Sequence, residues 1–119
     1  MGRPLVKPGE PVDVRRLGAE LGTRVNTLLV KTINVEIIQL VIPAGDLIPT
    51  HEAHGEIIFH CLEGQVLLSA RGKTHELNAG QLFYFCTNEP FSIRGIAPAS
   101  LLVTIITPKQ GQSVELIGN

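Results

Sequence analysis

Short apolar runs, each ended by turn residues, dominate the chain from Leu28 onward. β-branched and large apolar residues fill these runs, whereas Gly, Pro and Asn separate them, which is typical of strands in a sandwich or barrel. Because eight or more short strands at such spacing indicate a closed or layered β structure, the pattern favours an all-β fold. The predicted strands lie at residues 28–32, 34–42, 56–62, 65–70, 74–77, 81–86, 91–95 and 101–107.

The last of these strands is apolar on both faces. Residues 101–106 read LLVTII, whereas a sheet with one face in water alternates apolar and polar residues. The second face must therefore be covered by the N-terminal segment, by a helix within it, or by a second subunit. We predict a homodimer on this basis.

The N-terminal stretch has a different composition from the rest. Residues 1–27 are polar and rich in Gly and Pro, so we predict a covering segment followed by a single barrel domain over residues 28–119. Asp13 is a suitable N-cap for a short helix that ends near Leu21, because Val14, Leu17 and Leu21 share one helical face and Gly22 follows as a stop.

Composition narrows the function classes. The chain has 119 residues, the length of one domain, with 10 Lys and Arg against 11 Asp and Glu. A balanced charge argues against nucleic acid and anionic membranes as partners, and an aromatic content of 4% without Trp argues against base stacking. No apolar run reaches the length of a membrane-spanning helix, and the first ten residues lack the apolar core of a secretory signal.

The two cysteines, Cys61 and Cys86, fit neither a disulfide framework nor a CxxC metal site. We interpret both as small core residues, since unpaired cysteines are among the most buried residues. A reducing cytoplasm is the expected location.

Two segments carry a family resemblance. Residues 43–64 read PAGDLIPTHEAHGEIIFHCLEG, and residues 80–94 read GQLFYFCTNEPFSIR. Together they resemble the two motifs of the cupins, small jelly-roll barrels of the double-stranded β-helix type. The resemblance extends from Leu28 to Pro108 and implies a barrel with an internal pocket that is open at one end.

The resemblance also implies where a metal would bind. Cupins with an intact site use two His and one Glu from the first motif and one His from the second. Counted from Gly64 and Gly80, these positions hold His51, Ala53, Ile57 and Phe91. Apolar side chains donate no lone pairs, so the resemblance implies a dismantled metal site.

Our leading hypothesis is a protein that binds an unidentified small molecule, or an enzyme without a cofactor. Its pocket is mostly apolar, with His51 as the main polar group and Phe91 in the vacated His position. The predicted pocket residues are His51, Ala53, Ile57, Phe59 and Phe91.

A second hypothesis is a metal-dependent enzyme of the oxygenase, isomerase or decarboxylase type, as the family resemblance implies. His51 and His54, with Glu56 or His60 as a further ligand, would hold a divalent ion such as Fe, Mn, Ni or Zn. This requires a bulge near Gly55.

Without that bulge, strand alternation directs Ile57, Phe59 and Cys61 into the barrel. Glu56 and His60 then face outward.

A third hypothesis is a structural or interaction domain, because the strands that are apolar on both faces would also serve assembly.

Overall fold

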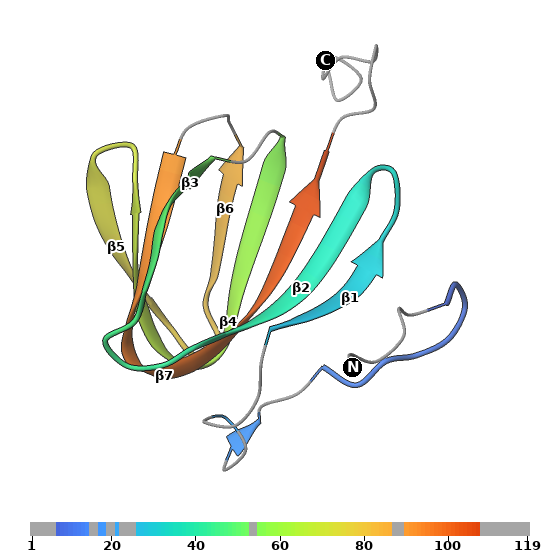
Figure 1. Ribbon diagram of the computed structural model, residues 1–119, viewed down its shortest axis with the longest axis horizontal. Helices are drawn as coiled ribbons and strands as arrows, with labels where there is room; N and C mark the ends of the chain where they lie inside the picture. Colours follow the sequence, from blue (N-terminus) through green and yellow to red (C-terminus); the bar gives the residue numbers. More distant parts are fainter. Residues whose placement is uncertain are drawn as a thin grey trace.

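The computed structural model describes residues 7–14, 17–18, 21, 26–52, 55–86 and 90–107, with residues 50–52 and 86 described by their backbone alone. This part of the chain is built from antiparallel strands and contains no α-helix (Figure 1). No helix in it is long and apolar enough to span a membrane. The strands are β1 (Thr27–Lys31), β2 (Val35–Ile42), β3 (Leu47–Glu52), β4 (Glu56–Ala70), β5 (Lys73–Asn78), β6 (Leu82–Cys86) and β7 (Pro90–Ile106).

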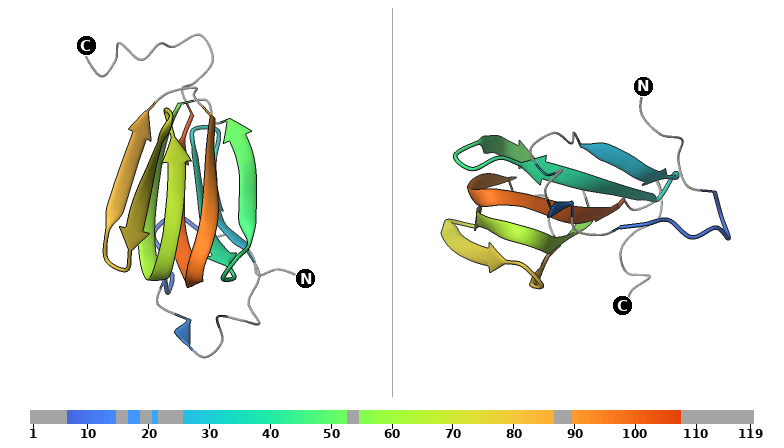
Figure 2. Two further views of the ribbon diagram at one scale, coloured as in Figure 1. Left: turned by 90° about the vertical axis from the view of Figure 1, so that its left-hand side faces the viewer. Right: turned by 90° about the horizontal axis from the view of Figure 1, so that it is seen from below.

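The two long strands, β4 and β7, each take part in two layers. Residues 56–61 of β4 pair with β6 and with residues 101–106 of β7, and β2 and β1 extend this first layer. Residues 65–70 of β4 pair with β5, and residues 90–94 of β7 pair with β3 in the second layer. Figure 1 shows both long strands curving at the bottom of the view, and Figure 2 shows the layers from two other sides. The barrel is therefore closed at this bend, and we refer to the opposite end, which holds the hairpin between β4 and β5, as the open end.

Glycines permit the close backbone approach at the bend. Gly64 has a φ of +83°, and a Cβ added to it would lie 2.1 Å from the carbonyl oxygen of Pro98. A Cβ on Gly95 would lie 2.3 Å from the carbonyl oxygen of Pro43. Since real Cβ atoms do not approach other atoms so closely, both positions require glycine.

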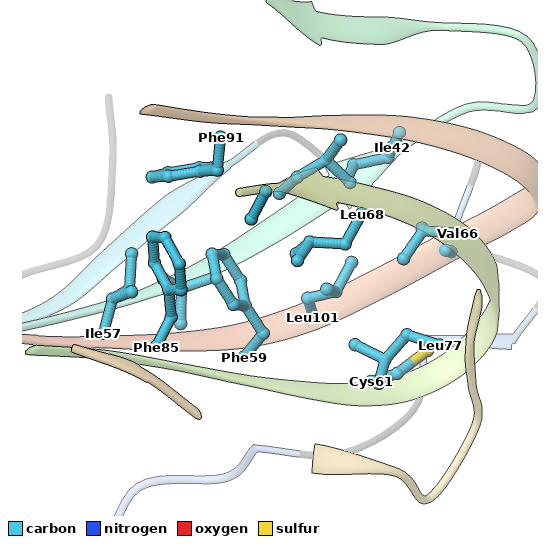
Figure 3. Close-up of a cluster of buried hydrophobic side chains, with 14 residues drawn as sticks. Ile42, Ile57, Phe59, Cys61, Val66, Leu68, Leu77, Phe85, Phe91 and Leu101 are labelled. Atoms are coloured by element: carbon cyan, nitrogen blue, oxygen red, sulfur yellow. The ribbon is translucent and has the colours of Figure 1, made fainter. Parts of the chain in front are cut away.

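The hydrophobic core fills the space between the layers (Figure 3). Ile57, Phe59 and Cys61 are buried, while Glu56 and His60 are only partly buried, so β4 alternates as its sequence predicts. Register shifts between Cys61 and Val66 mark the bend, after which the alternation resumes. The core consists of Ile42, Ile57, Phe59, Cys61, Val66, Leu68, Ala70, Leu77, Phe85, Phe91, Ile93, Ala99, Leu101 and Val103.

The strand predictions were wrong in three places. Residues 56–62 and 65–70 form one strand, β4, because Glu63-Gly64 bends the strand without ending it. Residues 91–95 and 101–107 likewise belong to one strand, β7, apart from Thr107. The strand β3, with the sequence LIPTHE, was not predicted; among the described strands it pairs with β7 alone, and such an edge position tolerates Pro49.

The helix predicted from Asp13 to Leu21 is not an α-helix among residues 13–14, 17–18 and 21, because residues 13, 14 and 17 are not helical and residues 18 and 21 have a 3₁₀ conformation. Gly18 has a φ of +58°, which a right-handed helix does not allow. The backbone N–H groups of Leu17 and Gly18 instead donate hydrogen bonds to the Glu63 carboxylate, at 2.6 and 3.0 Å. The described part of the N-terminal segment therefore contacts the closed end of the barrel.

Candidate functional site

The rings of Phe59, Phe85 and Phe91 lie together in the core (Figure 3), and Phe83 packs against this core as a partly buried residue. Phe59 is opposite Phe83 in the pairing of β4 with β6, and residues opposite each other share a face. The ring centroids of Phe59 and Phe91 are 5.3 Å apart in an edge-to-face arrangement, and those of Phe85 and Phe91 are 6.4 Å apart. Phe83 lies 6.3 Å from Phe85 and is only half-buried. The cluster thus has a packed interior and one partly accessible ring.

The structure brings most of the predicted pocket residues to the open end. His51 pairs with Phe91 across β3 and β7, which fixes its backbone at the open end; its side chain lies outside the described part. Ala53 and His54 also lie outside the described residues. Ile57 and Phe59 face inward and are each 1% exposed.

Two cavities of about 330 Å³ each adjoin the hairpin that joins β4 to β5. Ala70, Arg71 and Lys73 line both of them. Of the predicted pocket residues, Phe91 lines the second cavity, whereas Ile57 and Phe59 line neither. The first cavity is lined by Ala70, Arg71, Lys73, His75, Phe83 and Phe85, and the second by Ser69, Ala70, Arg71, Gly72, Lys73, Thr74, Pro90, Phe91 and Ser92.

Sequence reasoning missed the polar wall of the first cavity. Lys73 and His75 alternate along β5 with the buried Leu77, so all three share the inner face. The His75 ring is partly buried, and its centroid lies 5.1 Å from that of Phe83. Alternation with Leu77 could have indicated that Lys73 and His75 face inward. The contact between His75 and Phe83 could not be predicted in this way, because it joins two edge strands, β5 and β6, that are not neighbours in the sheet.

The closed end holds a separate group of buried polar side chains. The Ser100 hydroxyl donates to the Glu63 carboxylate at 2.7 Å, and the Cys61 thiol donates to the Glu63 carbonyl oxygen at 3.4 Å. Burial raises the pKa of the Cys61 thiol; the hydrogen bond to the Glu63 backbone opposes this rise, and the Glu63 charge adds to it. A buried, protonated thiol is a poor nucleophile, so Cys61 has a packing role.

The family comparison follows the same boundaries as the barrel. The family model for the cupin domain matches residues 38–105, which extend from β2 almost to the end of β7. This chain belongs to the cupin family.

Solved cupin structures share the fold at low sequence identity. A conserved protein of unknown function from Streptococcus pyogenes superposes with a TM-score of 0.71 at 15% identity, over 92% of this chain and 96% of the other. An RmlC-like cupin from Methanocaldococcus jannaschii, with a double-stranded β-helix fold, superposes with a TM-score of 0.70 at 23% identity, over 85% of this chain and 94% of the other. A predicted oxalate decarboxylase from Thermotoga maritima superposes with a TM-score of 0.64 at 22% identity, over 70% of this chain and 79% of the other. A search among curated proteins found no match. These similarities establish the jelly-roll fold of this cupin.

Two of the four positions counted as cupin ligands have described side chains, and neither side chain carries a donor atom for a metal ion. Ile57 and Phe91 stand at two of those positions, and both are hydrocarbon groups buried in the core. Glu56, an alternative ligand, faces outward and accepts a hydrogen bond from the Tyr84 hydroxyl at 3.0 Å. The described side chains contain no cluster of three His, Cys, Asp or Glu residues that would hold a metal.

Proposed function

We propose that this cupin binds a small organic molecule at the open end of its barrel, without the metal of cupins that have an intact ligand set. The observation that carries the proposal is the cavity between β5 and β6, whose floor is made by Phe83 and Phe85. Its volume of about 330 Å³ suits a small ligand, and aromatic rings provide a large apolar contact area.

The metal-free part of the proposal is supported by donor chemistry. Ile57 is 1% exposed and Phe91 is 6% exposed, and neither carries an atom that coordinates a cation. The name of the Thermotoga maritima neighbour, a predicted oxalate decarboxylase, is compatible with a small-molecule role for the fold. The homodimer and the cytoplasmic location stay predictions from the sequence.

A neutral fluorescent probe tests the binding site. N-phenyl-1-naphthylamine should gain fluorescence with the native protein, and Phe83→Ala should weaken its binding about fivefold, because an aromatic contact is lost. Leu82→Ala is the matched control, since Leu82 is adjacent on β6 but 60% exposed and faces away from the barrel interior. No fluorescence gain, or equal binding by both variants, would contradict the proposal.

Elemental analysis tests the metal-free part. Protein purified without chelator or nickel resin, then incubated with iron, manganese, nickel and zinc and desalted, should hold no stoichiometric metal. About one ion per chain would overturn this part and support the alternative set of His51, His54 and Glu56. His51→Ala would then be expected to abolish metal uptake.

A further inference from the structure

His75 is a polar side chain on the inner face of the barrel. In the pairing of β4 with β5 it is opposite Leu68, and residues opposite each other share a face. Leu68 and Leu77, the next inward residue of β5, are both buried, whereas Lys73 at the start of the strand is exposed. His75 is partly buried between them. Its imidazole therefore lies where solvent is already partly excluded.

The His75 imidazole has a ring contact but no hydrogen-bonding partner in the described part of the chain. Its ring centroid is 5.1 Å from that of Phe83, and the two ring planes are inclined by 41°. The described residues form no hydrogen bond or ion pair with its nitrogens. Polar groups that are withdrawn from water usually have such a partner, and an apolar side chain would serve folding better at this position. The imidazole is thus available to a ligand.

The first cavity joins this polar group to an aromatic floor. His75 lines that cavity together with Phe83 and Phe85, whose ring centroids are 6.3 Å apart with an interplanar angle of 29°. A flat apolar body packs well against such rings. A neutral imidazole offers one hydrogen-bond donor and one acceptor, and a hydroxyl group can satisfy either of them.

We infer that the ligand is a phenol whose hydroxyl group forms a hydrogen bond with the His75 imidazole and whose ring lies on Phe83 and Phe85. A phenolic hydroxyl, like that of tyrosine, is uncharged at neutral pH and both donates and accepts hydrogen bonds. The hydroxyl group lies in the plane of its ring, so ring packing and the hydrogen bond can form together. This inference rests on the proposed function and adds the chemical class of the ligand and the residue that recognises it.

Matched compounds test the inference by competition with N-phenyl-1-naphthylamine. 4-Propylphenol and propylbenzene share an apolar body and differ by the hydroxyl group. 4-Propylphenol should displace the probe at about fivefold lower concentration, because it adds one hydrogen bond in a partly buried site. 3-Phenylpropionate, which has a carboxylate that only accepts hydrogen bonds and loses hydration on binding, should bind more weakly than 4-propylphenol.

A variant assigns the difference to His75. His75→Phe should bind 4-propylphenol and propylbenzene equally, because phenylalanine keeps a ring beside Phe83 but has no hydrogen-bonding atom. His60→Phe is the matched control and should keep the fivefold difference. His60 alternates on β4 with the buried Phe59 and Cys61, so it faces outward, and it lines neither cavity.

The native protein gives a second readout that does not depend on a variant. NMR of the imidazole nitrogens, assigned to His75 through the contact of its ring with Phe83, reports the hydrogen bond directly. Saturating 4-propylphenol should shift these signals, and propylbenzene should shift them much less. Unchanged His75 signals with bound 4-propylphenol would overturn the hydrogen bond.

The outcomes separate the inference from the proposed function. Equal displacement of the probe by 4-propylphenol and propylbenzene would overturn the phenol assignment and leave an apolar binding site. A difference that persists in His75→Phe would overturn the role of His75. Tighter binding of 3-phenylpropionate would overturn the hydroxyl group as the recognised feature. If the probe and all three compounds fail to bind, the proposed function and the inference are both wrong.

Discussion

The two ends of the barrel use polar residues in opposite ways. At the closed end, Glu63 is 7% exposed, and its carboxylate accepts hydrogen bonds from two backbone N–H groups and the Ser100 hydroxyl. At the open end, the basic side chains of Arg71 and Lys73 are exposed and border both cavities. Buried polar groups need internal partners, whereas exposed charges do not.

This difference separates residues required by the fold from residues that suit a ligand. The closed end is determined by close backbone contacts and satisfied hydrogen bonds, so changes there should act on stability. The open end keeps exposed charges and the partly buried ring of Phe83, which are less buried than the groups at the closed end, so changes there should act mainly on binding. Variants at matched positions can test this separation.

The largest expected effect is at the bend. Gly64→Ala should destabilise the protein by about 3–5 kcal/mol, because the new Cβ would collide with the backbone of Pro98 and Ala99. Gly72→Ala at the open end is the control, since Gly72 also has a positive φ but has no atom within 4 Å of an added Cβ. Its cost should be about 1 kcal/mol, from the backbone conformation alone. Urea unfolding measures the free energy of unfolding of both variants, and similar losses of stability in the two would contradict the close approach at Gly64.

A smaller loss is expected from the buried carboxylate. Glu63→Gln should cost about 2 kcal/mol, because the amide lacks the charge that strengthens three hydrogen bonds and places an N–H₂ group near donors. Amide hydrogen exchange at Leu17 and Gly18 should become faster at the same time. Glu76→Gln, at an exposed position, should change stability by less than about 0.5 kcal/mol.

An unchanged free energy of unfolding in Glu63→Gln would show that the carboxylate is not required at the closed end. Faster exchange at Leu17 and Gly18 without a loss of stability would instead mean that the N-terminal contact is local and does not support the barrel.

The barrel could be predicted from the sequence because its core follows a period of two. Ile57, Phe59 and Cys61 alternate with polar or partly exposed residues, and the structure buries all three. The bend at Gly64 could not be predicted, because a Glu-Gly pair suits both a turn between strands and a bulge within one. Local residue preferences do not distinguish these cases; the pairing of β4 with β7 does.

The candidate site was harder to predict than the core. The family resemblance placed His51 at the open end, and its backbone lies there opposite Phe91. The cavity wall, however, depends on Lys73 and His75 of one edge strand approaching Phe83 of another. No sequence period relates these strands, since the contact arises only when the two layers face each other.

The smallest expected effect concerns the thiol at the closed end. Burial raises the pKa of Cys61 from its ordinary value of 9.0, so its contribution to stability is complete below that pH and is lost as the pH rises toward the folded-state value. The native protein should therefore lose stability as the pH rises above about 9, by at most about 1.4 kcal/mol per pH unit, relative to Cys61→Ser. Serine keeps a donor near the Glu63 carbonyl oxygen but does not titrate in this range. Cys86→Ser, at the end of β6 by the barrel opening, should retain the native slope. Urea unfolding at several pH values gives the slopes, and parallel curves for the native protein and Cys61→Ser would show that Cys61 is as accessible to solvent when folded as when unfolded.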